Sequence, residues 1–126
     1  MLGIEDCLTA VMAIPGALDA ILIDQTSGTA VATGGGSRRP DAEKSAAGLS
    51  ETLRATLDAI AVASPGGTVR LNDMIITTDG GYHLLKPLET VFNGPLVIYV
   101  RLDLERSNLA LARHRLQALS GDPMTT

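Results

Sequence analysis

Apolar positions along this 126-residue chain change period several times, and each change predicts a new element. Residues 3–14 place apolar side chains at helical spacing, and Pro15-Gly16 ends that helix. Residues 18–24 are apolar and β-branched enough to predict a buried strand. The turn residues at 25–28 then predict a hairpin with a second short strand at 29–33.

The rest of the chain predicts one long helix, three strands and a final helix. The predicted elements are a helix over 41–64, strands over 68–78, 82–88 and 96–102, and a helix over 107–119. Short connections between successive strands favour a largely antiparallel sheet. We therefore expect an α/β (α+β) fold with five strands and helices on both faces. It should form a single domain over residues 1–120, followed by a disordered tail at 121–126.

The long predicted helix has two faces to bury. One is an apolar stripe made by Ala46, Leu49, Leu53, Leu57 and Ile60. The other carries small side chains, namely Thr52, Ala55, Thr56, Ala59 and Ala63. Because one sheet covers only one side of a helix, the small-residue face predicts close packing against a second copy. Ordinary packing of that face against the sheet is the alternative.

Composition narrows the classes of partner. Hydrophobic residues make up 45% of the chain, but it has no Trp, one Phe and two Tyr, so few rings could stack on bases. The formal net charge of -4 gives no positive surface for phosphate backbones, so no nucleic-acid partner is expected.

The lone cysteine and the lengths of the apolar runs indicate the cellular compartment. Cys7 cannot form an internal disulfide, which favours a reducing compartment. The first residues lack a basic segment followed by an apolar stretch, and no run approaches the ~18 apolar residues of a membrane span. We expect a cytoplasmic protein without membrane insertion.

The glycine-rich stretch at 34–37 is a poor phosphate loop. A phosphate-binding loop of the G-x-x-x-x-G-K-[ST] type needs a Lys that reaches the phosphates, and this stretch has none. Arg38 and Arg39 follow it, and a mobile guanidinium could act in trans on a transferring phosphoryl group. A solvated pair that serves as a docking contact is the favoured interpretation.

Other reactive side chains are better explained by structural roles. Cys7 has no neighbouring cation or His in sequence and is expected to be packed. His83 and His114 are too scattered to form a metal site with the carboxylates. Asp24 and Asp103 both end predicted strands, and turn or helix-cap duties suit them better than paired catalysis. We therefore expect no catalytic residue, metal or cofactor, and no enzymatic activity.

Several motifs in fixed order resemble the roadblock/dynein-light-chain family and its bacterial MglB-like members. They are Pro15-Gly16, the strand at 20–24 with its Ser27-Gly28 turn, the glycine-rich loop before a long helix, and Ser107-Asn108-Leu109-Ala110-Leu111-Ala112-Arg113. The resemblance covers residues 3–119. It implies a fold related to longin and profilin-like domains.

The resemblance also implies a homodimer about a two-fold axis. The strand at 68–78 would pair with its twin at a sheet edge, and the helix at 41–64 would pack on its twin. The implied dimer contacts are Leu49, Thr52, Leu53, Ala55, Thr56, Ala59, Ile60, Ala63, Val69, Leu71, Asp73 and Ile75. Arg38 and Arg39 are the candidate contacts for another partner.

The function implied by this resemblance is regulation or scaffolding of a small Ras-like GTPase, in a signalling module linked to a sensor kinase. One alternative is a structural scaffold of a multiprotein complex that leaves GTP turnover unchanged. Another is a small-molecule sensor, which the scarcity of aromatic side chains disfavours.

Overall fold

The computed structural model describes residues 3–35, 42–88 and 94–120. Its elements follow in the predicted order of helix, two strands, helix, three strands and helix. They are α1 (Ile4–Met12), β1 (Ala17–Asp24), β2 (Thr29–Gly35), α2 (Ala42–Ala63), the 3-10 turn η1 (Pro65–Gly67), β3 (Met74–Thr78), β4 (Gly81–Pro87), β5 (Leu96–Leu102) and α4 (Leu109–Ser120). The predicted tail at 121–126 lies outside the described residues.

The strands form one five-stranded sheet in the order β2-β1-β5-β4-β3. Every neighbouring pair is antiparallel, as predicted from the short connections. The two central strands, β1 and β5, have the most continuous apolar sequences and are buried on both faces. Strands β2 and β3 are left as the two edges of the sheet.

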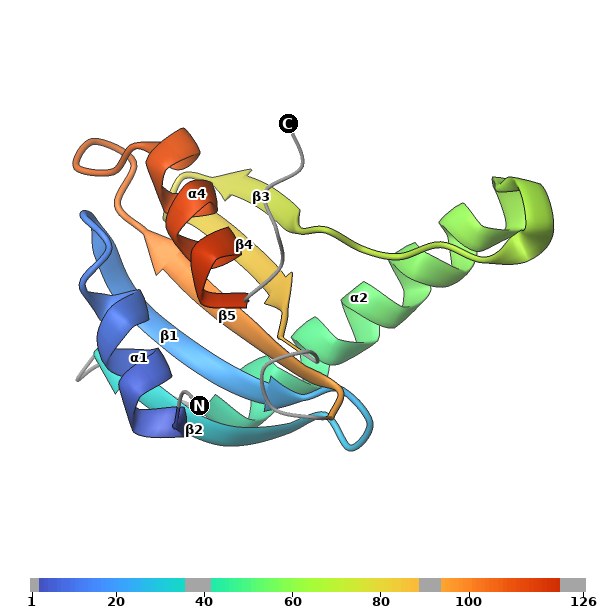
Figure 1. The fold of residues 1–126 in the computed structure, drawn as a ribbon, viewed down its shortest axis with the longest axis horizontal. Coiled ribbons are helices and arrows are strands. Elements are labelled where there is room, and N and C mark those ends of the chain that lie inside the picture. The colour runs from blue at the N-terminus through green and yellow to red at the C-terminus, as the bar shows by residue number, and fades with distance from the viewer. Residues whose placement is uncertain (1–2, 36–41, 89–93, 121–126) are drawn as a thin grey trace.

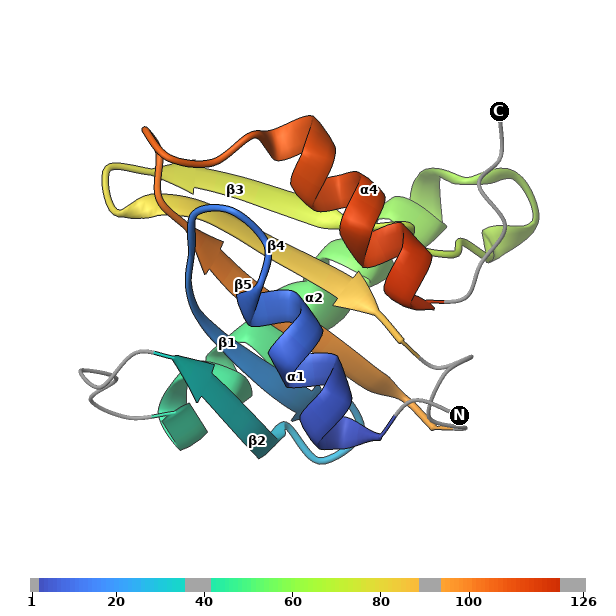
Figure 2. The same cartoon turned by 60° about the vertical axis from the view of Figure 1, so that its left-hand side comes forward.

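Helices cover both faces of the sheet (Figure 1). Helices α1 and α4 lie side by side on one face, and α2 crosses the other face (Figure 2). Along β1 and β5, alternate side chains point to opposite faces of the sheet and pack in two different core layers. Leu22 and Val100 belong to the core under α1 and α4, whereas Ile21 and Tyr99 belong to the core under α2. No helix in the described ranges is both long enough and apolar enough to cross a bilayer.

The predicted strand at 68–78 has the wrong start. Strand β3 begins only at Met74, and residues 68–73 are extended chain that pairs with no strand of the described residues. The reason is topological. The chain turns back at η1, beyond the sheet, and runs alongside α2 (Figure 1). It forms β3 only where it comes beside β4. A period-two pattern reveals extended backbone, but it does not reveal whether a neighbour is present to pair with it.

The Pro15-Gly16 turn fixes how α1 joins the sheet. Gly16 has φ +87°, and a Cβ there would lie 2.6 Å from the Cβ of Ser107. Its carbonyl accepts a 2.8 Å hydrogen bond from the backbone N–H of Asp103. Only glycine therefore allows the first loop to touch the loop that leads into α4.

Candidate functional site: the second half of α2 and the β3 edge

The first half of α2 is fixed to its own sheet. Ala46, Ser50 and Leu53 are its buried residues, and the helix packs mainly on β1 and β2. Ser50 and Gln25 exchange two hydrogen bonds, one from each side chain to the other residue's backbone carbonyl, at 3.2 and 3.0 Å. The anchor explains why the helix direction is well defined although its second half extends beyond the sheet.

The second half of α2 is only partly covered by the described residues, with Leu57 packed against the core. No residue after Leu53 in this helix is buried, and the helix runs past the sheet into solvent (Figure 1). The apolar stripe continues regardless, so that Ile60 is 43% exposed. An apolar helix face without cover is unusual in a stable monomer and marks an interaction surface.

The small-residue face is exposed along most of α2. Five residues that share one side of the helix are all exposed, namely Thr52, Ala55, Ala59, Val62 and Ala63. Four of them belong to the predicted small-residue face, and Val62 extends it. Thr52 donates its hydroxyl to the Gly48 carbonyl at 2.9 Å, so its polar atom is already satisfied inside the helix. The face therefore presents methyl groups and alanines, which let two helix backbones approach closely.

Val62 belongs to this face and is 89% exposed, the largest exposure among the large apolar residues of the described chain. It was not among the predicted contacts. Its spacing of three and seven residues from Ala59 and Ala55 is the signal that places it there.

Strand β3 offers an unpaired edge next to this helix. It pairs only with β4 among the described strands. On the α2 side of the sheet, Ile76 of β3 is 38% exposed, because α2 packs mainly on β1 and β2. Five residues without a charged side chain form this edge, which leaves it open to another strand.

The predicted dimer contacts divide into residues that pack within their own chain and residues that are exposed or half-exposed. Leu53 is 2% exposed and contributes to the core of its own chain, so it does not lie on the exposed surface. Asp73 also makes an intrachain contact, because Arg113 of α4 donates to its carboxylate at 2.7 Å. Leu49, Leu71 and Ile75 pack partly against the core clusters. The exposed or half-exposed remainder is Thr52, Ala55, Thr56, Ala59, Ile60, Ala63 and Val69.

A buried lysine holds the chain that leads into β3. Lys86 of β4 is 3% exposed, and its Nζ donates to the Asn72 carbonyl at 2.9 Å and to Asn72 Oδ1 at 3.1 Å. The same Nζ donates to Gln117 Oε1 of α4 at 2.8 Å. Together with the Asp73–Arg113 pair, these bonds tie the end of the 68–73 segment to β4 and α4. The position of the β3 edge is therefore set by side chains that sequence reasoning did not connect.

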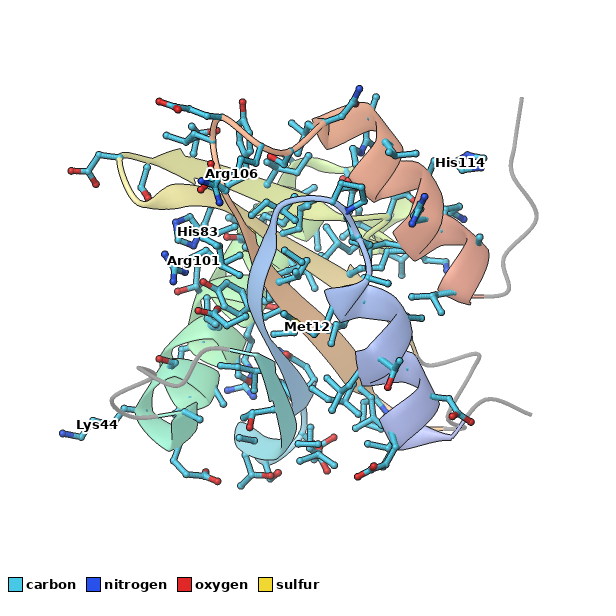
Figure 3. All side chains as sticks on the ribbon, turned by 90° about the vertical axis from the view of Figure 1, so that its left-hand side faces the viewer. Met12, Lys44, His83, Arg101, Arg106 and His114 are labelled. Carbon is cyan, nitrogen blue, oxygen red and sulfur yellow. The ribbon has the colours of Figure 1, made fainter. Side chains whose placement is uncertain are left out.

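A polar cluster lies on the same side of the sheet as α2. His83 Nδ1 is 2.8 Å from the Tyr99 hydroxyl, and His83 Nε2 is 2.7 Å from Thr78 Oγ1. The Arg101 guanidinium lies beside His83 (Figure 3) and binds the Asp19 carboxylate at 3.0 Å. Burial lowers the pKa of His83, Arg101 lowers it further, and Asp19 acts in the opposite direction. These hydrogen bonds connect β3, β4 and β5 at this end of the sheet.

The remaining candidate residues have the structural roles that were predicted for them. Asp24 Oδ1 accepts the backbone N–H groups of Thr26 and Ser27, at 2.9 and 3.3 Å. Asp103 Oδ1 likewise accepts two backbone N–H groups of its own loop. Strands β1 and β5 are antiparallel, so the two carboxylates lie at opposite ends of them and cannot work as a pair.

Cys7 is fully buried, and burial raises the pKa of its thiol, as expected of a packed cysteine. His114 is exposed on α4 and lies apart from His83 (Figure 3). No group of three His, Cys, Asp or Glu side chains that could hold a metal occurs within residues 3–35, 42–88 and 94–120. Arg38 and Arg39 lie outside the described residues.

No family model matches the sequence, and no curated protein matches it either. Solved structures do match the fold. MglB of Myxococcus xanthus has a TM-score of 0.75 at 15% identity, with 94% of this chain and 91% of that chain covered. The gliding protein MglB of Thermus thermophilus has a TM-score of 0.73 at 17% identity, covering 95% of this chain and 88% of that chain.

A Roadblock/LC7 domain from Streptomyces avermitilis gives a TM-score of 0.70 at 17% identity, covering 90% of this chain and 87% of that chain. At these identities the likeness shows the fold. The chain therefore has the fold of MglB and Roadblock/LC7 domains, and the resemblance stated from its motifs is confirmed at that level.

Proposed function

We propose that this protein is a non-enzymatic homodimeric adaptor of the cytoplasm that binds a small Ras-like GTPase and modulates or scaffolds it. The observation that carries the proposal is the second half of α2, where a 22-residue helix leaves Ile60 and its small-residue face exposed. A second copy placed about a two-fold axis covers both surfaces.

The β3 edge supports the same arrangement. Pairing β3 with its twin removes two unpaired edges at once and joins the two sheets. The segment 68–73 is already extended and lies next to α2, so it can lengthen that strand pair. A structure of MglB in a tetrameric arrangement, with a TM-score of 0.74 at 16% identity, supports self-association as a use of this fold.

The GTPase partner rests on the likeness to MglB and on the chemistry of the surface. The described residues offer rigid apolar and small-residue faces, which suit protein docking better than turnover of a substrate. A dimer of this kind acts by holding the switch loops of a GTPase in one conformation. Arg38 and Arg39, which precede α2 in sequence, remain the predicted contacts for that partner.

GTP hydrolysis by the small GTPase encoded nearest to this protein tests the proposal, measured with and without the dimer and alongside a binding assay. We expect a complex and a changed hydrolysis rate. A complex with an unchanged rate would favour the structural scaffold. The absence of both a complex and a rate change would refute the proposal. Arg38→Ala with Arg39→Ala should weaken the complex and leave the mass of the dimer unchanged.

A further inference from the structure

Strand β2 is the second open edge of the sheet, and its sequence leaves it unprotected. Thr29–Gly35 contains no charged residue and no proline, the usual devices that keep an edge from pairing. Among the described strands it pairs only with β1. Its outward backbone groups can therefore accept another strand, at the opposite end of the sheet from the proposed β3 pairing (Figure 2).

A groove runs along this edge, between α1 and β2. It has a volume of about 530 Å³, and one side of α1 and the end of β2 line it. The lining residues are Glu5, Leu8, Thr9, Met12, Ala13, Thr33 and Gly34. Leu8, Met12 and Ala13 make its apolar part, and the side chains of Glu5 and Thr9 make its polar part. Thr33 is the cross-strand partner of Ile21, so its side chain points to the α2 face and its backbone lines the groove.

Glycines bring the helix down onto this strand. A Cβ at Gly34 would lie 3.1 Å from Met12 Cγ, and Gly35 has φ +66° with a Cβ that would lie 2.5 Å from Met12 Cε. Met12 can therefore lie directly over the strand, on the opposite side of the sheet from Lys44 of α2 (Figure 3). The shape of the groove follows from this close approach of α1 to β2.

The shape of the groove fits the side chains of an added strand. In a strand that pairs with β2, every second side chain points to the α1 side of the sheet. Those side chains would enter the groove, while the main chain would bond to the free edge. This combination of backbone pairing and side-chain pockets is how sheets recognise extended peptides.

The charged side chains around the β2 edge indicate which kind of strand it can bind. Elements α1, β1 and β2 contain no Lys or Arg, and the two acidic residues in the first turn of α1, Glu5 and Asp6, are exposed. Lysine side chains of an added strand that point to the α1 side complement that wall, with their methylene groups against the apolar part of the groove and their ammonium groups toward Glu5. A second copy of this chain would bring two acidic walls together, and like charges at an interface oppose association.

We propose that the β2 edge and the α1 groove bind an extended segment of a partner protein that alternates basic and apolar residues, as a sixth strand. The proposal does not depend on the β3-edge dimer or on a GTPase.

The test uses three labelled peptides of about six residues, a length typical of one strand. One alternates lysine and valine, one alternates lysine and proline, and one alternates glutamate and valine. Fluorescence anisotropy gives the affinities, and amide hydrogen exchange locates the binding. We expect the lysine–valine peptide to bind and to slow exchange in β2. The lysine–proline peptide has the same charge, but half of its residues lack a backbone N–H and its prolines disfavour pairing within a sheet, so it should bind at least about tenfold more weakly. The glutamate–valine peptide should not bind.

Variants of the groove wall give the second arm. Glu5→Lys and Thr9→Lys, both on the α1 wall of the groove and at exposed positions, should weaken binding of the lysine–valine peptide about tenfold through like-charge repulsion. The control is Glu51→Lys, the same charge change on α2 at a side chain with 79% exposure, which should leave binding unchanged.

Three results would overturn the proposal. The first is equal affinity for the lysine–proline peptide, which would mean that only charge attracts it. The second is protection of β3 in place of β2. The third is protection of β2 that rises with protein concentration in the absence of peptide, which would assign the edge to a second copy.

Discussion

Lys86 is the residue whose burial most constrains the structure. Its ammonium group is held by three oxygen atoms from Asn72 and Gln117, on the connector before β3 and on α4. Sequence alone marks it only as a charge inside an apolar strand. Its partners lie 14 and 31 residues away, so no local pattern could have identified them.

Removing the Lys86 side chain should be much more costly than removing its exposed neighbour Arg113. Lys86→Ala removes three hydrogen bonds from a charged side chain that is 3% exposed, and we expect a loss of about 2–3 kcal/mol in the free energy of unfolding. Arg113→Ala removes an ion pair whose Arg side chain is 47% exposed, and such pairs contribute less than about 1 kcal/mol. Urea unfolding of both variants measures the difference. Equal losses would contradict the assigned role of Lys86.

His83 should make stability depend on pH. Its pKa in the folded protein lies below the ordinary value of 6.5, mainly because of burial and the Arg101 charge. The unfolded chain therefore binds more protons than the folded protein as the pH falls below 6.5, so the free energy of unfolding decreases there and recovers at higher pH. His83→Gln should reduce this decrease, measured by urea unfolding at about pH 5.5 and about pH 7.5. His114→Gln, at an exposed position of α4, is the matched control. If His83→Gln loses as much free energy of unfolding between the two pH values as the wild type does, His83 is not the cause of the pH dependence.

At the scale of elements, helix α2 is the clearest success of sequence reasoning. Its predicted bounds of 41–64 agree closely with Ala42–Ala63, because Pro65-Gly66-Gly67 ends it and a long apolar stripe defines it. The predicted start of β3 was wrong, since residues 68–73 have a strand-like sequence but pair with no strand of the described residues. The predicted end at residue 78 was right.

The two halves of α2 should respond differently to substitution. Leu53→Ala opens a cavity in the core and should cost about 2–5 kcal/mol at any protein concentration. Ala59→Arg places a long cation on the small-residue face and should leave the single chain folded while it prevents close packing of two helices. Thermal unfolding gives the first effect and solution mass the second. If Ala59→Arg also unfolds the chain, the face is buried in some other way.

At the scale of the whole molecule, the sheet has two open edges that differ in their surroundings. The β3 edge continues from the 68–73 segment that runs alongside α2 (Figure 1), whereas the β2 edge lies beside a groove with the acidic first turn of α1 on its wall. The sequence predicted the antiparallel sheet and its helical layers. It did not predict the groove, because that depends on how closely Met12 approaches Gly34 and Gly35 in space.

The most direct test of the account is the mass of the wild-type protein in dilute solution, measured by sedimentation equilibrium beside Ala59→Arg. We predict twice the 13.1 kDa of one chain for the wild type, and a folded single chain for the variant. A wild-type protein that stays folded at the mass of one chain, at every concentration measured, would contradict the proposed dimer.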